Sequence, residues 1–290
     1  MKNSSLKWFY LIGLSLVWGS SFILMKYALL GLNPLQVGSL RMIITALVLI
    51  IFGFNSLKSL TGNNWKYIGL SAAVGTFFPV FLFAIAIYHM DSAIAAILNS
   101  LVPFFALILG VTVFGFSFKK QQIIGIIIGL LGTILLILSG KSVGGIADYK
   151  YPLMILLASI GYAFNVNIVK RHLQEVKPIA ITTGTFVLVL IPALVVLATT
   201  GFFKSFEWSS KTQQSLFYIV ILSVIGTAVA KVFFNKLVQI STPIFSTSVT
   251  YLIPLVAVFW GFLDGERLTI IQILAGGIIL LGVYLVNKKR

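Results

Sequence analysis

The amino-acid sequence predicts an all-α membrane protein with ten transmembrane helices, arranged as two inverted five-helix repeats around a central cavity. Three observations support this fold class. The 290 residues are 59% hydrophobic and 9% charged, with a mean hydropathy of +1.07, whereas soluble domains are roughly one-quarter charged. Apolar runs of about twenty residues, the length that crosses a bilayer, follow one another along the chain. The second half of the sequence also repeats the first.

The helices are delimited by Gly, Pro, Asn and clusters of charge. The expected ranges are 7–30, 34–54, 66–88, 92–116, 121–139, 151–171, 178–200, 215–238, 243–263 and 269–287. Three of them begin with a capping residue, in the pairs Asn33-Pro34, Asp91-Ser92 and Thr242-Pro243. The segment from Gly125 to Gly129 favours close packing of the fifth helix against another helix.

Basic residues indicate the orientation. With the N-terminus inside, twelve Lys and Arg residues fall in inner segments and five in outer loops, so both termini are predicted to be cytoplasmic, in an inner or plasma membrane. The net charge of +15 therefore reflects membrane topology, and no basic stripe or aromatic platform indicates a nucleic-acid partner. The first apolar segment is too long for a signal-peptide core and lacks a small-residue cleavage site, which indicates a retained helix. The absence of cysteine excludes disulfides, thiol catalysis and thiolate metal sites.

Internal repetition is the strongest signal. A shift of 151 positions aligns helices three to five on helices eight to ten without a gap, and a shift of 144 aligns the earlier helices. Matched residues include Gly75-Thr76 with Gly226-Thr227, Pro103 with Pro254, Gly125 with Gly276, and Lys26 with Lys170. The predicted repeats are residues 1–140 and 150–290. Because five helices per repeat is an odd number, the second copy enters the membrane from the opposite side, an architecture of secondary transporters with a midplane substrate site.

Several motifs also resemble the EamA-type members of the drug/metabolite transporter superfamily, over essentially the whole chain. They are Trp18-Gly19-Ser20-Ser21-Phe22 followed by Lys26, Leu40-Arg41, the proline-centred helices four and nine, and Gly265-Glu266-Arg267. The resemblance implies ten helices, two inverted repeats, a central cavity, and export or exchange of small metabolites such as amino acids. The sequence departs from the family pattern at Gly115, where a glutamate is frequent, and at Lys231, where an aromatic residue is expected.

Lys231 stands in an otherwise apolar stretch, GTAVAKVFFNK. Thr227, Lys231 and Asn235 are spaced four residues apart and so share one helix face. A buried charge costs roughly 2.5 to 3.5 kcal/mol at a helix centre, so we expect this face to line a cavity. Structural hydrogen bonding between helices, or a helix boundary that puts Lys231 near the inner interface, are the alternatives.

Other polar residues in the expected helices are candidates for the same cavity. Asn99 and Thr250 are repeat equivalents, each four residues before a proline that leaves their carbonyl without its helical donor. Further candidates, for which helix-helix contacts are an equal alternative, are Tyr251, Ser100, Asn165 and Asn167. Trp18 and Phe22 are candidates for an apolar wall, with packing as the alternative. For Arg41, support of a neighbouring helix is favoured over extension to the headgroups.

The six carboxylates all fall in loops, caps or helix starts, so no proton relay of the usual Asp/Glu type is predicted at the midplane. The two histidines, His89 and His172, are expected on opposite sides of the membrane, which leaves no catalytic residue, metal site or cofactor site in view. The sequence thus predicts a non-enzymatic secondary transporter of carboxylate-bearing small molecules, in contact with the lipid bilayer, with Lys231 attracting the anion. A membrane-embedded enzyme, a lipid-handling protein and a channel are the alternatives, and the oligomeric state is left open.

Overall fold

The computed structural model describes residues 2–90, 92–138, 149–204, 208–263 and 269–287. Within these ranges the chain is helical and contains no strand. Six helical stretches are long and apolar enough to cross a membrane. They are Ser5–Ala28, Pro34–Ser59, Gly62–His89, Lys150–His172, Pro178–Thr199 and Ser210–Ile240. Four shorter apolar helices lie within the remaining expected ranges. The chain is therefore a multi-pass membrane protein.

The helices of the first half follow one another closely along the chain. Their bounds are α1 (Lys2–Ala28), α2 (Pro34–Gly53), the 3-10 helix η1 (Phe54–Ser59), α3 (Gly62–Ala72), the π-helix η2 (Ala73–Phe77), α4 (Phe78–His89), α5 (Ser92–Asn99), α6 (Val102–Thr112) and α7 (Lys120–Leu138). The Asn33 side chain caps α2 through the backbone N–H of Gln36, as expected. The expected cap Asp91 lies outside the described residues.

The second half has a matching series of helices. Their bounds are α8 (Lys150–His172), α9 (Pro178–Thr199), α10 (Ser210–Ser223), the π-helix η3 (Val224–Val229), α11 (Ala230–Ile240), α12 (Pro243–Thr247), α13 (Val249–Leu263) and α14 (Ile270–Asn287). The side chain of Thr242 accepts from the backbone N–H of Phe245 and caps α12, as expected.

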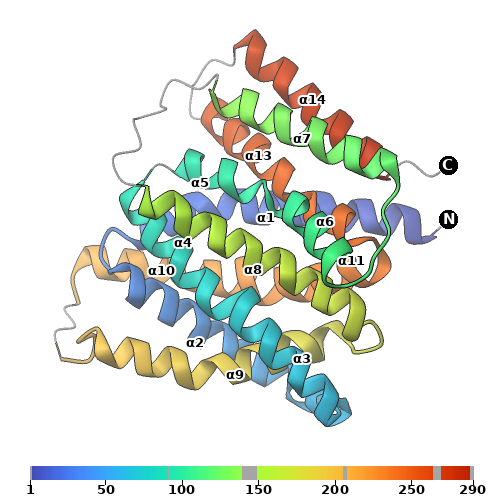
Figure 1. The fold of residues 1–290 in the computed structure, drawn as a ribbon. Coiled ribbons are helices and arrows are strands. Elements are labelled where there is room, and N and C mark those ends of the chain that lie inside the picture. Colours follow the sequence, from blue (N-terminus) through green and yellow to red (C-terminus); the bar gives the residue numbers. More distant parts are fainter. Residues whose placement is uncertain (1, 91, 139–148, 205–207, 264–268, 288–290) are drawn as a thin grey trace.

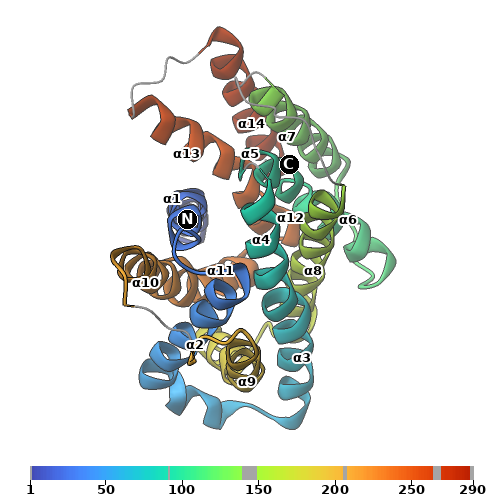
Figure 2. The ribbon, with the colours of Figure 1, turned by 90° about the vertical axis from the view of Figure 1, so that its left-hand side faces the viewer.

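The helices are stacked in layers (Figure 1), with the α7/α14 pair at one face and the α2/α9 pair at the other. Helix α1 lies between them and packs against α10, α11 and α13 (Figure 2), while α8 packs against α3, α4, α5 and α6. The start of α1 and the end of α14 lie on the same side of the molecule. Segments far apart in sequence thus surround the middle of the bundle.

Glycines permit close contacts between α7 and α14. A Cβ added at Gly282 would lie 2.5 Å from the backbone nitrogen of Gly129, and one at Gly125 would lie 2.8 Å from the carbonyl oxygen of Gly282. The expected close packing through Gly125 and Gly129 is therefore present, and the partner is α14. Large aliphatic side chains face outward over the same helices, as a lipid-facing surface requires.

Candidate functional site

A cavity of about 140 Å³ lies in the middle of the bundle. A buried water needs roughly 10 to 15 Å³ measured in the same way, so the cavity has room for a small organic solute. The lining residues come from both halves of the chain. The polar members are Trp18, Ser21, Arg41, Thr76, Asn99, Tyr162, Asn165, Thr227, Lys231, Thr247 and Thr250.

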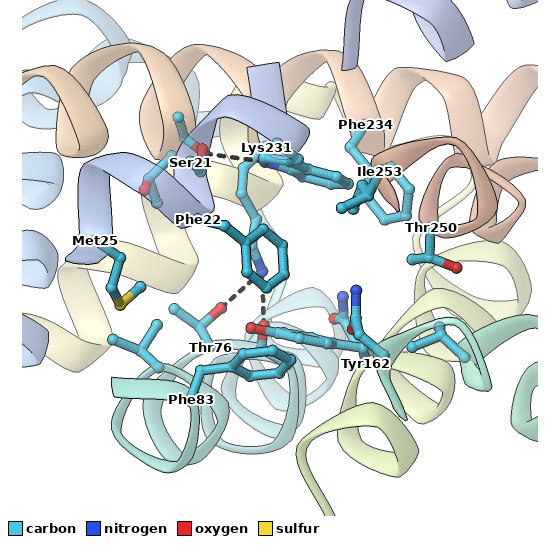
Figure 3. Close-up of a pocket in the computed structure, with 18 of the residues that line it drawn as sticks. Ser21, Phe22, Met25, Thr76, Phe83, Tyr162, Lys231, Phe234, Thr250 and Ile253 are labelled. Atoms are coloured by element: carbon cyan, nitrogen blue, oxygen red, sulfur yellow. Dashed lines mark hydrogen bonds between the residues drawn. The ribbon is translucent and has the colours of Figure 1, made fainter. Parts of the chain in front are cut away.

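Lys231, near the start of α11, reaches across the cavity to the other half of the chain. Its Nζ donates to the carbonyl oxygen of Gly75 at 2.6 Å and to Oγ1 of Thr76 at 3.0 Å. Figure 3 shows the side chain extended from its helix toward Thr76. The ammonium has three N–H donors, so two have protein acceptors and one is left for another partner.

Arg41, on α2, also lines the cavity. Its Nε donates to Oγ1 of Thr227 at 2.8 Å, which agrees with the expected support of a neighbouring helix. Its two terminal nitrogens have no hydrogen-bond partner among the described residues. Those two nitrogens form the planar fork that binds carboxylates in a bidentate manner.

The two π-helices present corresponding groups to the cavity. Gly75 and Thr76 belong to η2, and Gly226 and Thr227 belong to η3. On η2, Lys231 donates to both the Gly75 carbonyl and the Thr76 hydroxyl. On η3 the two acceptors have different donors. Trp18 Nε1 donates to the Gly226 carbonyl at 3.0 Å, and Arg41 Nε donates to the Thr227 hydroxyl.

A π-turn leaves backbone carbonyls outside the regular i→i−4 pattern, which explains why side chains satisfy them here. The hydroxyl of Thr227 itself donates to the carbonyl of Leu222, five residues earlier, at 2.9 Å.

Interrupted helices contribute the opposite wall. Helix α5 ends at Asn99 and α6 begins at Val102, so the helix is interrupted just before Pro103. In the second half the break falls at Ser248, between α12 and α13, and Pro254 lies inside α13. Asn99 and Thr250 both line the cavity. Oγ1 of Thr250 donates to the carbonyl of Thr247 at 2.9 Å.

The Asn99 side chain is 6% exposed, and its Oδ1 is buried without a hydrogen-bond partner among the described residues.

Apolar side chains make up most of the remaining surface. They are Phe22, Met25, Val80, Phe83, Ile87, Val102, Val166, Phe234 and Ile253. Phe22, Phe83 and Phe234 are visible around the cavity in Figure 3, with Tyr162 facing them. The Tyr162 ring lies 5.8 Å from that of Phe83, and its hydroxyl lies close enough to the Arg41 guanidinium to interact with it electrostatically. The site therefore combines a cationic region with aromatic walls.

Seven of the eleven candidate residues line the cavity: Lys231, Thr227, Asn99, Thr250, Trp18, Phe22 and Asn165. The other four, which are Asn235, Tyr251, Asn167 and Ser100, are buried elsewhere. Nδ2 of Asn235 donates to Oγ1 of Thr182 on α9 at 3.0 Å, one helical turn beyond Lys231. The hydroxyl of Tyr251 donates to the carbonyl of Ile126 on α7 at 3.1 Å. Nδ2 of Asn167 donates to the carbonyls of Ala106 and Ala163, at 3.0 Å each. Asn235, Tyr251 and Asn167 each make a bond to another helix, the alternative that the sequence left open, while the bond from Asn167 to Ala163 lies within α8.

Among the cavity residues that sequence reasoning missed, three bear on the chemistry of the site: Arg41, Thr76 and Tyr162. Arg41 was assigned to helix support alone, although a second charge deep in an apolar segment was a signal for the cavity. Thr76 aligns with Thr227 at the 151-residue shift, and Tyr162 aligns with Trp18 at the 144-residue shift. Both alignments marked these residues as counterparts of predicted site residues.

The described residues contain no cluster of three or more His, Cys, Asp or Glu side chains that could hold a metal ion. Among them Glu175 is the single carboxylate, and it is exposed between α8 and α9. No described carboxylate therefore lines the cavity beside Arg41 and Lys231. The arrangement suits an anionic group, because a carboxylate would supply the acceptors that these cations lack.

Known proteins resemble this chain over most of its length. The model of the EamA-like transporter family matches residues 6–138 and again residues 150–288. An uncharacterized transporter of Archaeoglobus fulgidus is 28% identical over 98% of this chain and 99% of its own length. The uncharacterized inner membrane transporter YedA of Escherichia coli K12 is 29% identical over 97% of this chain and 90% of its own. A probable amino-acid metabolite efflux pump of the same strain is 24% identical over 93% of this chain and 90% of its own.

A crystal structure of a protein with 16% identity shares the fold, with a TM-score of 0.76 over 98% of this chain and 96% of that one.

Proposed function

Because the chain belongs to the EamA-like transporter family, we propose that it is a secondary transporter that exports or exchanges small carboxylate-bearing metabolites by alternating access. Amino-acid metabolites and other carboxylate-bearing solutes are the class we have in mind, and the name of the Escherichia coli efflux pump among its relatives supports this class. The chain is a membrane transporter by family rather than an enzyme.

One observation carries the proposal: Arg41 and Lys231 line the same apolar cavity and no described carboxylate does. A cation inside a membrane is costly unless it is paired. A substrate carboxylate would pair with the free fork of Arg41 and with the third N–H of Lys231. Binding energy would then come from charge-assisted hydrogen bonds, which are about twice as strong as neutral ones.

The transport cycle we propose uses the two halves as inverted repeats, residues 1–140 and 150–290, with ten membrane-spanning helices in all. The family model matches each half separately, and the cavity receives residues from both. In such architectures the two repeats move against each other and open a central site to alternate sides. The bonds of Lys231 to η2, and of Arg41 and Trp18 to η3, join the halves around the site.

The test is flux of carboxylates in proteoliposomes. We expect Lys231→Met to reduce saturable counterflow at least tenfold, and Arg41→Lys, which keeps the charge but removes the fork, to raise KM with less effect on maximal flux. Lys236→Met is the matched control, because Lys236 lies on the same helix but outside the cavity lining. Monodisperse protein on size exclusion would verify folding. Undiminished flux in Lys231→Met would refute the role of charge pairing.

Counterflow measurements also distinguish a transporter from a channel, a membrane-embedded enzyme or a lipid-handling protein. A channel would give flux that does not saturate and shows no stimulation by solute on the opposite side. A membrane-embedded enzyme or lipid-handling protein would give no solute flux at all.

We further propose that the protein lies in the inner or plasma membrane with both termini in the cytoplasm. The inner segments carry more basic residues, and the two chain ends lie on the same side of the bundle (Figure 1). Since the chain has no cysteine, single substitutions give a direct test. Ser5→Cys and Glu175→Cys should resist an impermeant thiol reagent added to intact cells, whereas Lys204→Cys should react. The opposite pattern would reverse the topology.

A further inference from the structure

We infer that the cavity selects carboxylates whose second polar group is uncharged, such as N-acylated amino acids or 2-hydroxy acids, over zwitterionic amino acids. This inference rests on the proposed function and specifies the substrate class of the same site. It follows from the charges of the lining residues, from one unpartnered side chain, and from the apolar walls.

The charges of the lining disfavour an ammonium group. Arg41 and Lys231 are both cationic, and no described carboxylate lines the cavity to neutralise a third positive charge. The carbonyl oxygens of Gly75 and Gly226 already accept from Lys231 and Trp18. A zwitterion would place its ammonium a few ångströms from its own carboxylate, and so close to the two cations that hold that carboxylate. Like charges in a poorly solvated site repel strongly.

Asn99 supplies what a neutral polar group needs. Its side chain is more than nine-tenths buried, lines the cavity, and has an Oδ1 without a hydrogen-bond partner among the described residues. Leaving a buried amide unpaired costs free energy, so a ligand that pairs with it gains affinity. An amide has one acceptor and two donors, which matches a substrate amide or hydroxyl. The hydroxyl of Tyr162 is a second neutral group in the same cavity.

The walls favour an apolar substituent on the substrate. Phe22, Phe83 and Phe234 line the cavity, with Val80 and Ile253 among the aliphatic residues. Burying an apolar group against them is favourable in proportion to the area covered. The best probe is therefore an acid with an aromatic side chain and a neutral amide, for which N-acetyl-L-phenylalanine serves.

The experiment compares three acids as competitors of counterflow in proteoliposomes: N-acetyl-L-phenylalanine, L-phenylalanine and 3-phenylpropionate. The first two differ in the charge on nitrogen, and the third lacks the nitrogen. We expect N-acetyl-L-phenylalanine to compete at a concentration at least tenfold below that of L-phenylalanine. It should also compete a few-fold better than 3-phenylpropionate.

Two substitutions of Asn99 identify its part in this preference. Asn99→Leu should remove the advantage of N-acetyl-L-phenylalanine over 3-phenylpropionate. Asn99→Asp should shift the preference toward L-phenylalanine, because the new carboxylate can pair with an ammonium. Asn55→Asp is the charge-matched control, since Asn55 is exposed on η1 and away from the cavity; it should keep the wild-type preference.

The outcomes separate this inference from the proposed function. If no carboxylate is transported by the wild-type protein, the proposed function is wrong. If L-phenylalanine competes as well as its N-acetyl derivative, the proposed function stands and the inference on charge is overturned. If Asn99→Asp and Asn99→Leu both keep the wild-type preference, the assignment of Asn99 is overturned.

Discussion

Two of the three N–H groups of Lys231 donate to acceptors on the other half of the chain, the Gly75 carbonyl and the Thr76 hydroxyl. These acceptors make the cation tolerable inside the bundle. They also compete with any anion for the ammonium. A role in binding and a role in structure therefore predict opposite effects when one acceptor is removed.

Thr76→Val provides this test. The substitution is nearly isosteric and leaves Lys231 with the Gly75 carbonyl alone. If Lys231 binds the substrate, we expect KM for the transported acid to fall by about tenfold, since a hydrogen bond to a charged group contributes roughly 1.5 kcal/mol or more. The measurement is concentration-dependent counterflow.

Thr133→Val is the matched control, because the Thr133 hydroxyl is buried and donates to the Gly129 carbonyl on α7. It should leave KM unchanged. A raised KM in Thr76→Val would instead assign Lys231 to positioning of the helices.

For single residues, the sequence predicted which side chains line the cavity better than it predicted their hydrogen-bond partners. Lys231 stood out because a charge in an apolar run is costly, and it does line the cavity. Its bond to Gly75 was not predictable, since a backbone carbonyl has no sequence signal and this one is available through the π-helical geometry of η2. Asn235 shares the helical spacing of Thr227 and Lys231, yet it lies one turn further along and meets α9. The spacing of residues along the sequence predicts which side of a helix they share. It does not predict where along the helix the cavity ends.

Among the elements, the π-helices η2 and η3 occupy corresponding places in the two halves. Both contain the Gly-Thr pair that the 151-residue shift aligned. The helix ranges themselves were predictable from hydropathy, and helix fills most of each expected range within the described residues, although α6 ends at Thr112 and not at residue 116. The π-turns and the breaks at residues 100–101 and 248 were not. Local hydrogen bonding determines where π-turns and helix interruptions occur, and hydropathy contains no information about it.

The α7/α14 pair gives a prediction about stability at the same scale. A Cβ at Gly282 would lie 2.5 Å from the backbone nitrogen of Gly129, whereas nothing lies within 4 Å of a Cβ at Gly277, on the same helix. Gly282→Ala should therefore destabilise the protein by about 2 kcal/mol, the range of overpacking effects. Gly277→Ala should be neutral or slightly stabilising, since alanine favours helix.

Thermal unfolding in detergent would measure both changes. Equal melting temperatures for the two variants would show that α7 and α14 separate easily at this point.

Gly115 is the other glycine with a distinct role. It lies between α6 and α7 with φ of 66°, in the left-handed region where residues with a Cβ are strained. The resemblance to the EamA-type family had implied a glutamate at this position. The backbone conformation gives a physical reason for glycine at this position in the present chain.

For the molecule as a whole, the cavity residues come from elements distributed along the entire chain, from Trp18 on α1 to Ile253 on α13. Internal repetition in the sequence indicated such a meeting of the two halves. It could not indicate which polar residues of each half meet, because that depends on the helix crossings seen in Figures 1 and 2.

The cavity with two cations and no described carboxylate also has an energetic consequence. Cells keep their interior at a negative voltage, and moving one charge through 100 mV is worth about 2.3 kcal/mol. That voltage alone would expel a monovalent anion against a roughly fiftyfold concentration ratio. An exporter of such anions needs no proton-carrying side chain at the midplane.

We therefore expect an imposed potassium diffusion potential to accelerate anion efflux from proteoliposomes, and a pH gradient without voltage to have little effect. Dependence on the pH gradient alone would contradict this. If the voltage dependence holds, the resting membrane potential is itself the energy source, and the protein returns an accumulated acid to the medium without carrying a coupled ion.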